Sequence, residues 1–494
     1  MEAQGKRGLE DVAARARAAS HVLGSLSREA KDAALVEIAR ELEVQRLRIL
    51  EANREDKRAA RDANLSSSLQ KRLNLEGDKF ETLLQGISDV VKVADPVGRA
   101  TLATELDEGL DLYRVTCPIG VLCIIFESRP EAAVQIASLA IKSSNAVILK
   151  GGKEALRSNM ALVAAFRVAL DRAGLPADAV QLVSTREDIH ELLQLDRYID
   201  LVIPRGSNQL VRSVMDSTKI PVMGHADGIC SVYVDRDADL ERAVHVVVDS
   251  KTQYTAACNA AETLLVHADC VETMLPVIGE ALMAAGVKLH ADADSLPFLP
   301  PSCTVPATEE DFVKEYLGLE MAVKVVQDVQ AAIEHINLCG SQHTDAIVTE
   351  NGATAELFMQ GVGSAGVFHN ASTRFADGFR FGFGAEVGVS TNRIHARGPV
   401  GLEGLVIYKY RLHGHGQCVK DYGIGAGMRA YKHRKIRLMG DDPRAPRLDA
   451  PPASICVGVG VGGGGNVYFA MDRHVHHLSS RADMWRLASW LAGN

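Results

Sequence analysis

Residues 119–150 read IGVLCIIFESRPEAAVQIASLAIKSSNAVILK, and this stretch decides the fold class. The run 119–126 is short, apolar and partly β-branched, which predicts a buried strand. A helix is expected over 130–141, because it begins with a proline and the first helical turn tolerates proline. The apolar run 146–150 predicts the next strand. Strand, helix and strand in this order are typical of a parallel sheet covered by helices.

The alternation of strands and helices continues along the chain. Further strands are expected at 180–183, 199–203 and 346–349, with helical stretches between them. Residues 9–95 are rich in Ala, Leu, Glu, Arg and Lys and read as helices. A chain of 494 residues is too long for one core, so two or three domains are expected. We therefore predict an α/β protein with doubly wound parallel sheets.

Composition excludes several classes of function. The chain is 47% hydrophobic and 24% charged, as packed globular proteins are, and its net charge of −9 comes without a long basic run. Nucleic-acid binding is therefore not expected. No apolar run approaches the ~18 residues of a membrane span, and residues 1–20 lack the apolar centre of a secretory signal. The nine cysteines form no CxxC pairs, which favours reduced thiols over a disulfide frame or a metal site.

One cysteine is distinguished by its neighbours. Cys258 lies between small residues in 251–267, KTQYTAACNAAETLLVH, just before an apolar run, 262–266, that predicts another buried strand. A thiol on a loop that leads into a strand can reach a substrate, and small flanks leave room for that substrate. Most free cysteines are instead small buried hydrophobic residues, so a structural role stays open for Cys258 at this point.

A short turn, 204–208 (PRGSN), links the strand expected at 199–203 to a following helix. The backbone amides of Gly206 and Ser207 would face an anion such as a pyrophosphate at the start of that helix. Ligands also tend to bind at the carboxyl ends of parallel strands. The turn has one Gly-Ser pair in place of a GxGxxG pattern, and plain turn formation is the alternative.

Several blocks of the sequence resemble the gamma-glutamyl phosphate reductases, a branch of the aldehyde dehydrogenase superfamily, and they occur in the same order. The resemblance covers about residues 10–420, and its blocks are 126–155, 199–211, 217–230, 258–267 and 368–405. The wording GHADGIC is most similar to the reductase half of the bifunctional pyrroline-5-carboxylate synthase of plants and algae. The kinase half of that enzyme is absent from this sequence.

The resemblance implies a division into domains. An alternating pattern around Glu108-Gly109 predicts a hairpin, and the matching hairpin builds the oligomer in aldehyde dehydrogenases. The expected parts are an NADP-binding domain (1–97 and 118–250), a catalytic domain (251–395), a small oligomerisation flap of β-structure (98–117 and 396–415) and a partly disordered C-terminal extension (416–494). One helix is expected over 473–491 within that extension.

The resemblance also implies a reaction. Cys258 would attack the carbonyl of L-glutamyl 5-phosphate, phosphate would leave, and NADPH would reduce the thioester to L-glutamate 5-semialdehyde, a precursor of L-proline. Sulfur suits both halves because it is a strong nucleophile and a good leaving group. The Cys258 backbone amide and the Asn145 side chain are expected to stabilise the oxyanion. The alternative for Asn145 is a turn before a strand.

Further site residues are implied in the same way. For the cofactor, Lys150 is expected to grip the ribose and favour the 2′-phosphate of NADP, Gly206 and Ser207 to hold the pyrophosphate, and Glu315 to bond the nicotinamide ribose. For the anionic substrate, arginines and two polar side chains are expected, since arginine grips oxyanions bidentately. This second set is Arg129, Asn259, Ser372, Arg374 and Arg397. Structural ion pairs or helix-surface positions are the alternatives for these charged residues.

A motif of ordinary aldehyde dehydrogenases is missing. Those enzymes carry Glu-Leu-Gly-Gly upstream of the cysteine, and its glutamate activates water. The matching segment here, 222–228, reads VMGHADG, with Gly224 near the place of the glutamate. Loss of that base suits a thioester that is made with phosphate and must resist water. His225 or Asp227 could act as bases instead, although a hydrogen-bonded structural role is the favoured interpretation of His225.

Partners and location complete the expectations. We expect a homo-oligomer (dimer or tetramer), a glutamate 5-kinase as candidate partner, no membrane, no metal, and a cytoplasmic location with an organelle stroma as the alternative. Two rival functions stay open. One is an aldehyde dehydrogenase that oxidises a free aldehyde, and the other is a non-catalytic reductase-like protein that serves as an assembly partner.

Overall fold

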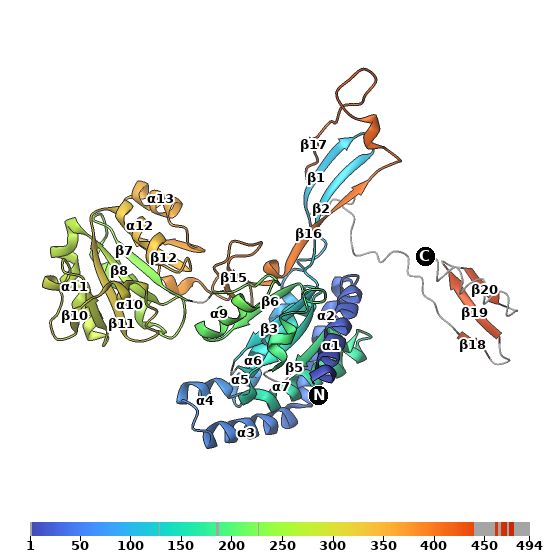
Figure 1. The fold of residues 1–494 in the computed structure, drawn as a ribbon, viewed down its shortest axis with the longest axis horizontal. Coiled ribbons are helices and arrows are strands. Elements are labelled where there is room, and N and C mark those ends of the chain that lie inside the picture. Colours follow the sequence, from blue (N-terminus) through green and yellow to red (C-terminus); the bar gives the residue numbers. More distant parts are fainter. Residues whose placement is uncertain are drawn as a thin grey trace.

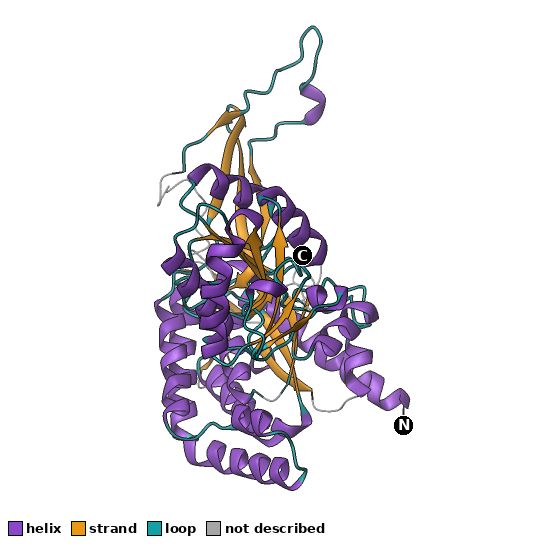
Figure 2. Cartoon of the chain, turned by 90° about the vertical axis from the view of Figure 1, so that its left-hand side faces the viewer, coloured by secondary structure: helices purple, strands orange, loops and turns teal. Residues whose placement is uncertain are grey.

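The structure is a computed structural model, and it describes residues 2–127, 129–183, 187–225, 227–438, 460–462, 466–471 and 474–478. Figure 1 shows two α/β units beside each other and a β flap that projects away from them. Figure 2 shows the same body from the side, with helices around the sheets. Within the described residues, no helix combines the length and the apolar character that crossing a membrane requires.

The first α/β unit is built on a four-stranded parallel sheet in the order β5-β4-β3-β6. Its strands are β3 (Val121–Phe126), β4 (Ala146–Gly151), β5 (Val180–Val183) and β6 (Leu201–Arg205). The connecting helices are α6 (Pro130–Lys142), α7 (Leu156–Arg172) and α8 (Glu187–Leu192), and α9 (Asn208–Ser217) follows β6. Every residue of β3 and β4 is buried, as their unbroken apolar runs predicted.

Five N-terminal helices belong to the same unit. They are α1 (Glu2–Leu23), α2 (Arg28–Val44), α3 (Arg46–Asp62), α4 (Ser67–Leu73) and α5 (Asp78–Lys92). Ser27 caps α2, because its hydroxyl accepts from the Ala30 amide, and the apolar stripe Leu35, Ile38 and Leu42 faces the core. The prediction of helices over 9–95 is confirmed.

The second α/β unit has a seven-stranded parallel sheet in the order β10-β9-β11-β8-β7-β12-β13. Its strands are β7 (Cys230–Val234), β8 (Ala261–His267), β9 (Lys288–Ala291), β10 (Thr304–Pro306), β11 (Glu320–Val326), β12 (Thr344–Val348) and β13 (Gly366–His369). Its helices are α10 (Leu240–Thr252), α11 (Val271–Ala284), α12 (Val329–Cys339) and α13 (Gly352–Gly361). The fully buried strand β8 lies at the centre of this sheet.

The predicted border between residues 250 and 251 is wrong. β7 hydrogen-bonds to β8 and β12, so β7 and the following helix α10 belong to the second sheet and not to the first. The sequence reads as one continuous series of strands and helices, and nothing local marks where the chain changes sheets.

The flap is an antiparallel sheet in the order β16-β2-β1-β17. Its strands are β1 (Ala100–Asp107), β2 (Leu110–Pro118), β16 (Val406–His413) and β17 (Arg434–Lys435). The hairpin turns at Gly109, whose φ of +68° favours glycine. The predicted end of the flap at 415 is wrong, because β17 pairs with β1 and the Arg434 guanidinium bonds the Glu105 carboxylate.

The remaining strands are short. β14 (Gly388–Ser390) pairs with β15 (Gly398–Val400), and residues 374–387 form loops and a 3-10 turn. β18 (Gly460–Gly462), β19 (Asn466–Met471) and β20 (His474–Leu478) form an antiparallel sheet. The helix predicted over 473–491 is therefore wrong at 474–478, and the rest of that stretch, with both tryptophans, lies outside the described residues.

Candidate active site

The predicted nucleophile lies at the amino edge of the second sheet. Cys258 is half-buried and lies three residues before the start of β8. The segments that precede the neighbouring strands β11, β7 and β12 end at the same edge, because adjacent parallel strands begin on one side of a sheet. These segments carry Glu315, His225 and His343. Four distant pieces of sequence thus meet at one edge of the sheet.

Gly228 packs closely against the loop that carries Cys258. A Cβ atom at Gly228 would fall 2.1 Å from the Cys258 carbonyl oxygen and 2.6 Å from the Cys258 Cβ, so no larger residue fits. The Gly228 amide donates to Oε1 of Glu315 at 3.0 Å. Burial raises the pKa of Glu315, and this hydrogen bond opposes the rise. The expected cofactor residue Glu315 therefore lies within the network that supports the nucleophile loop.

A buried ion pair joins the two ends of the loop that carries Cys258. Lys251, in the last turn of α10, lies 2.5 Å from the carboxylate of Glu262 in β8, and both side chains are fully buried. The other carboxylate oxygen of Glu262 accepts from the Leu317 amide at 3.3 Å. Burial raises the pKa of Glu262 to about 7, and Lys251 opposes that rise. The pair therefore fixes both the nucleophile loop and the segment that carries Glu315.

Two histidines face Cys258. A ring nitrogen of His225, a ring nitrogen of His343 and Sγ of Cys258 all lie within 4.8 Å of one another. The two rings meet edge to face with centroids 4.9 Å apart. Nδ1 of His225 lies 2.9 Å from the Val389 carbonyl oxygen, and His343 is fully buried. The sequence pointed to His225 as a candidate base, whereas His343 was missed.

Two arginines act on the sulfur electrostatically. Burial lowers the pKa of Arg205, at the end of β6, and of Arg374. A negative charge on the Cys258 sulfur would oppose this lowering in both arginines. Nε of Arg374 donates to Gln253 at 3.0 Å, and its guanidinium lies 5.9 Å from the centre of the Tyr254 ring. Arg129 lies close enough to Arg205 to oppose its charge. Of the predicted arginines, Arg129 and Arg374 therefore belong to the same group of positive charges as Arg205.

Two other predicted side chains shape the segment next to the sulfur. Asn259 donates to the Ala376 carbonyl oxygen at 2.9 Å, and its buried Oδ1 has no hydrogen-bond partner among the described residues. Ser372 accepts from the Arg374 amide at 3.3 Å and from the Ser250 hydroxyl at 3.2 Å. Both residues thus position the turn that carries Arg374.

Two predictions fail on geometry. Asn145 is fully buried, accepts from the Gly120 amide at 2.8 Å and donates to the Leu405 carbonyl oxygen at 2.8 Å, so its amide stabilises the turn before β4 and is not offered to an oxyanion. Arg397 donates to the carbonyl oxygens of Thr391 and Gly363, and its guanidinium is thereby committed to the main chain. Both residues were predicted to bind ligands because an amide and a guanidinium can bind an anion. Tertiary contacts decide their actual hydrogen-bond partners, and the sequence does not show those contacts.

The expected phosphate-binding turn has the geometry of an anion site. The Ser207 amide, at the start of α9, donates to the Glu127 carboxylate at 3.0 Å. A Cβ at Gly206 would fall 2.6 Å from the same carboxylate. Lys150 is buried at the end of β4, and its Nζ donates to the Gly151 carbonyl oxygen at 2.7 Å. The turn thus already holds one carboxylate oxygen at the helix N-terminus, and binding of a dinucleotide by these residues stays a prediction.

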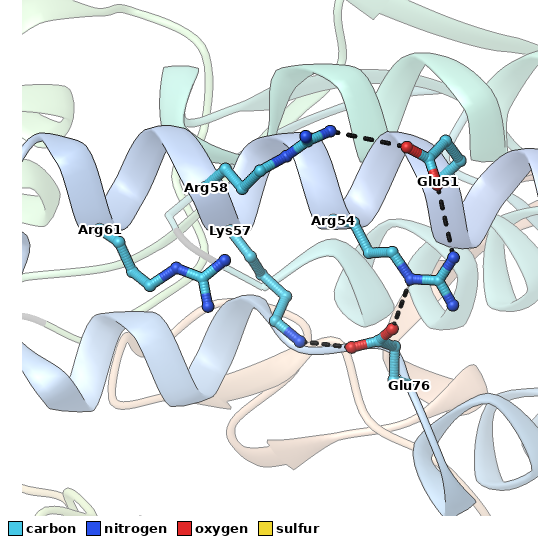
Figure 3. Close-up of a pocket in the computed structure, with 6 residues that line it drawn as sticks. All are labelled: Glu51, Arg54, Lys57, Arg58, Arg61 and Glu76. Atoms are coloured by element: carbon cyan, nitrogen blue, oxygen red, sulfur yellow. Dashed lines mark hydrogen bonds and ion pairs between the residues drawn. The ribbon is translucent and has the colours of Figure 1, made fainter.

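A separate charged pocket of about 380 Å³ lies on α3 and contains no predicted site residue. Figure 3 shows its cations paired with two acids: Arg54 and Lys57 contact Glu76, and Arg58 contacts Glu51. Exposed pairs of this kind contribute ~0–1 kcal/mol each. We interpret this pocket as part of the solvated helical surface that the sequence predicted.

The chain is similar to known proteins over most of its length. A family model described as the aldehyde dehydrogenase family matches residues 1–298. A gamma-glutamyl phosphate reductase of Pelotomaculum thermopropionicum is 52% identical over 428 residues, which are 87% of this chain and 98% of the relative. The crystal structure of a gamma-glutamyl phosphate reductase from Thermotoga maritima matches with a TM-score of 0.81 and 41% identity, over 83% of this chain and 99% of that one.

A more distant structure shares the fold alone. It is a glyceraldehyde-3-phosphate dehydrogenase from Methanocaldococcus jannaschii in complex with NADP, with a TM-score of 0.58 and 13% identity over 83% of this chain and 95% of that chain.

The chain belongs to the aldehyde dehydrogenase family. Within it, the chain groups with the gamma-glutamyl phosphate reductases and is therefore an oxidoreductase. The predicted fold class and family are both confirmed.

Proposed function

We propose that the chain reduces L-glutamyl 5-phosphate to L-glutamate 5-semialdehyde and phosphate with NADPH, through a thioester on Cys258, in L-proline biosynthesis. The observation that supports this proposal most is the position of Cys258, which is half-buried just before the central strand of the second sheet. Arg205 and Arg374 interact electrostatically with its sulfur. Cations near the sulfur attract an anionic acyl phosphate to it. The high identity to gamma-glutamyl phosphate reductases over most of the chain supports the same substrate.

The chain's own residues divide the work. The Cys258 sulfur attacks the acyl carbonyl, and phosphate departs. Arg374 and Arg129 bind the anionic ends of the substrate, while Asn259 and Ser372 hold the turn that aims Arg374. The Cys258 backbone amide remains the candidate donor to the oxyanion, and Asn145 drops out of that role. Gly224, in the segment before β7, leaves no carboxylate at the place where hydrolytic relatives activate water.

A dinucleotide is proposed to bind the first unit. Gly206 and Ser207 would hold its pyrophosphate, Lys150 its ribose and 2′-phosphate, and Glu315 the nicotinamide ribose. The reduced nicotinamide supplies a hydride when it is bound. Membership of the aldehyde dehydrogenase family supports a nicotinamide cofactor.

Assembly and location are proposed as well. The edge strand β16 carries exposed aromatic side chains, Tyr408 and Tyr410, on a projecting flap, which suits a homo-oligomer built through that sheet. A glutamate 5-kinase would supply the labile acyl phosphate, and a cytoplasmic location fits a biosynthetic enzyme.

The reverse reaction tests the function. We expect the purified chain to reduce NADP when given pyrroline-5-carboxylate and phosphate, because the semialdehyde and its cyclic form interconvert. Cys258→Ser should lose several orders of magnitude in rate, whereas Cys418→Ser, at an exposed thiol after β16, should keep the wild-type rate. Oxidation that proceeds without phosphate would favour a hydrolytic aldehyde dehydrogenase. A complete lack of activity in folded protein would favour the non-catalytic alternative.

A further inference from the structure

The ring of His343 lies close to the sulfur of Cys258. The side chain is fully buried, and a ring nitrogen lies within 4.8 Å of the Cys258 sulfur. Nε2 has no hydrogen-bond partner among the described residues. Because a buried polar atom without a partner destabilises the fold, native proteins seldom keep one that serves no purpose.

The neighbours of His343 engage Nδ1 and leave Nε2 open among the described residues. Nδ1 lies 3.0 Å from Oγ1 of Thr344 and 3.7 Å from the sulfur of Cys230. Oγ1 of Thr344 can accept a hydrogen from Nδ1 or donate one to it, so these contacts allow either tautomer. In the tautomer with the hydrogen on Nδ1, the lone pair lies on Nε2, and this buried nitrogen can act as a base.

His225 holds the His343 ring from the other side. Its Nδ1 faces the Val389 carbonyl oxygen at 2.9 Å, and a carbonyl can only accept, so this ring is fixed to the main chain. The two rings lie at 78° to each other with centroids 4.9 Å apart. His225 is partly exposed, so water can satisfy its second nitrogen, whereas His343 has no such outlet.

We propose that His343 is a catalytic residue, with Nε2 accepting the proton of the Cys258 thiol and passing it to the departing phosphate. This inference rests on the proposed function and extends it by naming the base that takes the proton of the Cys258 thiol.

Atoms and electrons balance in this step. The S–H bond breaks as N–H forms on Nε2, and the sulfur electron pair forms the S–C bond to the acyl carbon. The C–O bond to phosphate then breaks, its electron pair stays on the phosphate oxygen, and that oxygen takes the proton from Nε2. Neutral imidazole and an acyl-Cys258 thioester remain.

Other charged groups also face this pair and belong in any interpretation of its pH dependence. They are Arg205 and Arg374, which act on the sulfur, Glu315 and Glu386, which act on His225, Asp227 beside Glu315, and Cys230 with Asp345 beside it. The arginines keep their charge throughout the working range and so act equally in wild type and in a His343 variant. A comparison of the two proteins therefore isolates the imidazole.

The test uses iodoacetamide, which alkylates thiolates and needs neither substrate nor cofactor. Alkylation of each cysteine in the full chain is followed by peptide mass spectrometry over a range of pH. We expect Cys258 to react at least about tenfold faster at neutral pH than the exposed Cys418 of the same molecule. His343→Asn, which keeps an amide near the place of Nδ1 but removes Nε2, should bring Cys258 down to the Cys418 rate.

A second histidine provides the matched control. His335 in α12 is half-buried and also has an Nε2 without a hydrogen-bond partner in the part of the chain that the structure describes, but its ring is packed edge to face against Phe312. His335→Asn should leave Cys258 alkylation unchanged. The proposal is overturned if wild-type Cys258 reacts no faster than Cys418, a result that needs no variant to fold, or if His343→Asn keeps the wild-type rate. A chain with fast, His343-dependent alkylation and no phosphate-dependent activity would overturn the proposed substrate and keep the Cys258–His343 pair.

Discussion

Lys251 and Glu262 form a fully buried ion pair, 2.5 Å from nitrogen to oxygen, that joins the end of α10 to β8 across the loop carrying Cys258. The loop between the helix and the cysteine is short, so the pair fixes it from both of its ends. We expect this contact to matter for stability and for the placement of the sulfur.

Glu262→Gln should destabilise the chain by about 3–5 kcal/mol, because it leaves the Lys251 charge buried without its partner. The measurement is urea unfolding followed by circular dichroism. The exposed pair Arg46–Glu81 gives the control, and Glu81→Gln should change stability by at most about 1 kcal/mol. Equal effects from the two variants would contradict a special role for the buried pair.

Gly228→Ala should slow turnover in the reverse reaction about 100-fold while the chain stays folded. The added Cβ would meet the Cys258 backbone at 2.1 Å, and displacement of a nucleophile by about 1 Å has an effect of that size. Gly352→Ala is the control, since a Cβ at the start of α13 meets no atom within 4 Å. Wild-type kinetics for Gly228→Ala would show that the two segments separate freely.

Arg374→Lys should raise KM for the anionic substrate at least about tenfold with a smaller change in kcat, because lysine loses the planar two-pronged contact with a carboxylate or phosphate. Arg397→Lys is the matched variant. Its guanidinium bonds main-chain carbonyl oxygens, so we expect lower thermal stability and an unchanged KM. Steady-state kinetics and a melting curve on both variants separate these outcomes, and the reverse pattern would restore Arg397 as a ligand-binding residue.

Asn145→Ala should cost about 1–3 kcal/mol for each buried group left unpaired, namely the Gly120 amide and the Leu405 carbonyl. Turnover by the protein that remains folded should change less than about threefold, measured at a temperature well below the melting point. If the variant kept its stability but turned over about 100-fold more slowly, an oxyanion role would be assigned to this residue instead.

Asp345 predicts a pH-dependent stability. Burial raises its pKa from 3.8 to about 6, so between these values the folded chain keeps a proton that the unfolded chain has released. The stability contributed by this group is complete below pH 3.8 and is lost as pH rises to about 6, by about 3 kcal/mol in all. Asp345→Asn does not titrate, so the difference in unfolding free energy between wild type and variant should change across this window, and parallel curves would contradict the assignment.

The sequence predicted the strands better than the boundaries between units. β3, β4 and β8 could be predicted from their apolar runs. A strand that is buried on both faces does not alternate between apolar and polar residues. β7 is equally apolar, but which sheet it joins depends on hydrogen bonds to β8 and β12. The two-residue strand β17 has no detectable pattern and exists only through its pairing with β1.

Candidate site residues could be named from the sequence where a motif carried them. Cys258 and Gly206 stand in recognisable segments, whereas His343 stands in SQHTDA, which has no distinguishing chemistry until the sheet brings it next to the sulfur. The expectation that ligands gather at carboxyl ends of strands also pointed away from it, since His343, His225 and Cys258 precede their strands. The predictions for Asn145 and Arg397 failed for the opposite reason. Their residue types suit an anion, but both side chains already donate hydrogen bonds to main-chain carbonyl oxygens.

The Ser207 amide at the head of α9 is already satisfied by Glu127. If a pyrophosphate binds here as proposed, it must displace a resident carboxylate, and its affinity would reflect the difference between two anions rather than the whole strength of one contact. The same tethered carboxylate could return to the amide afterwards and so assist release of the proposed ligand.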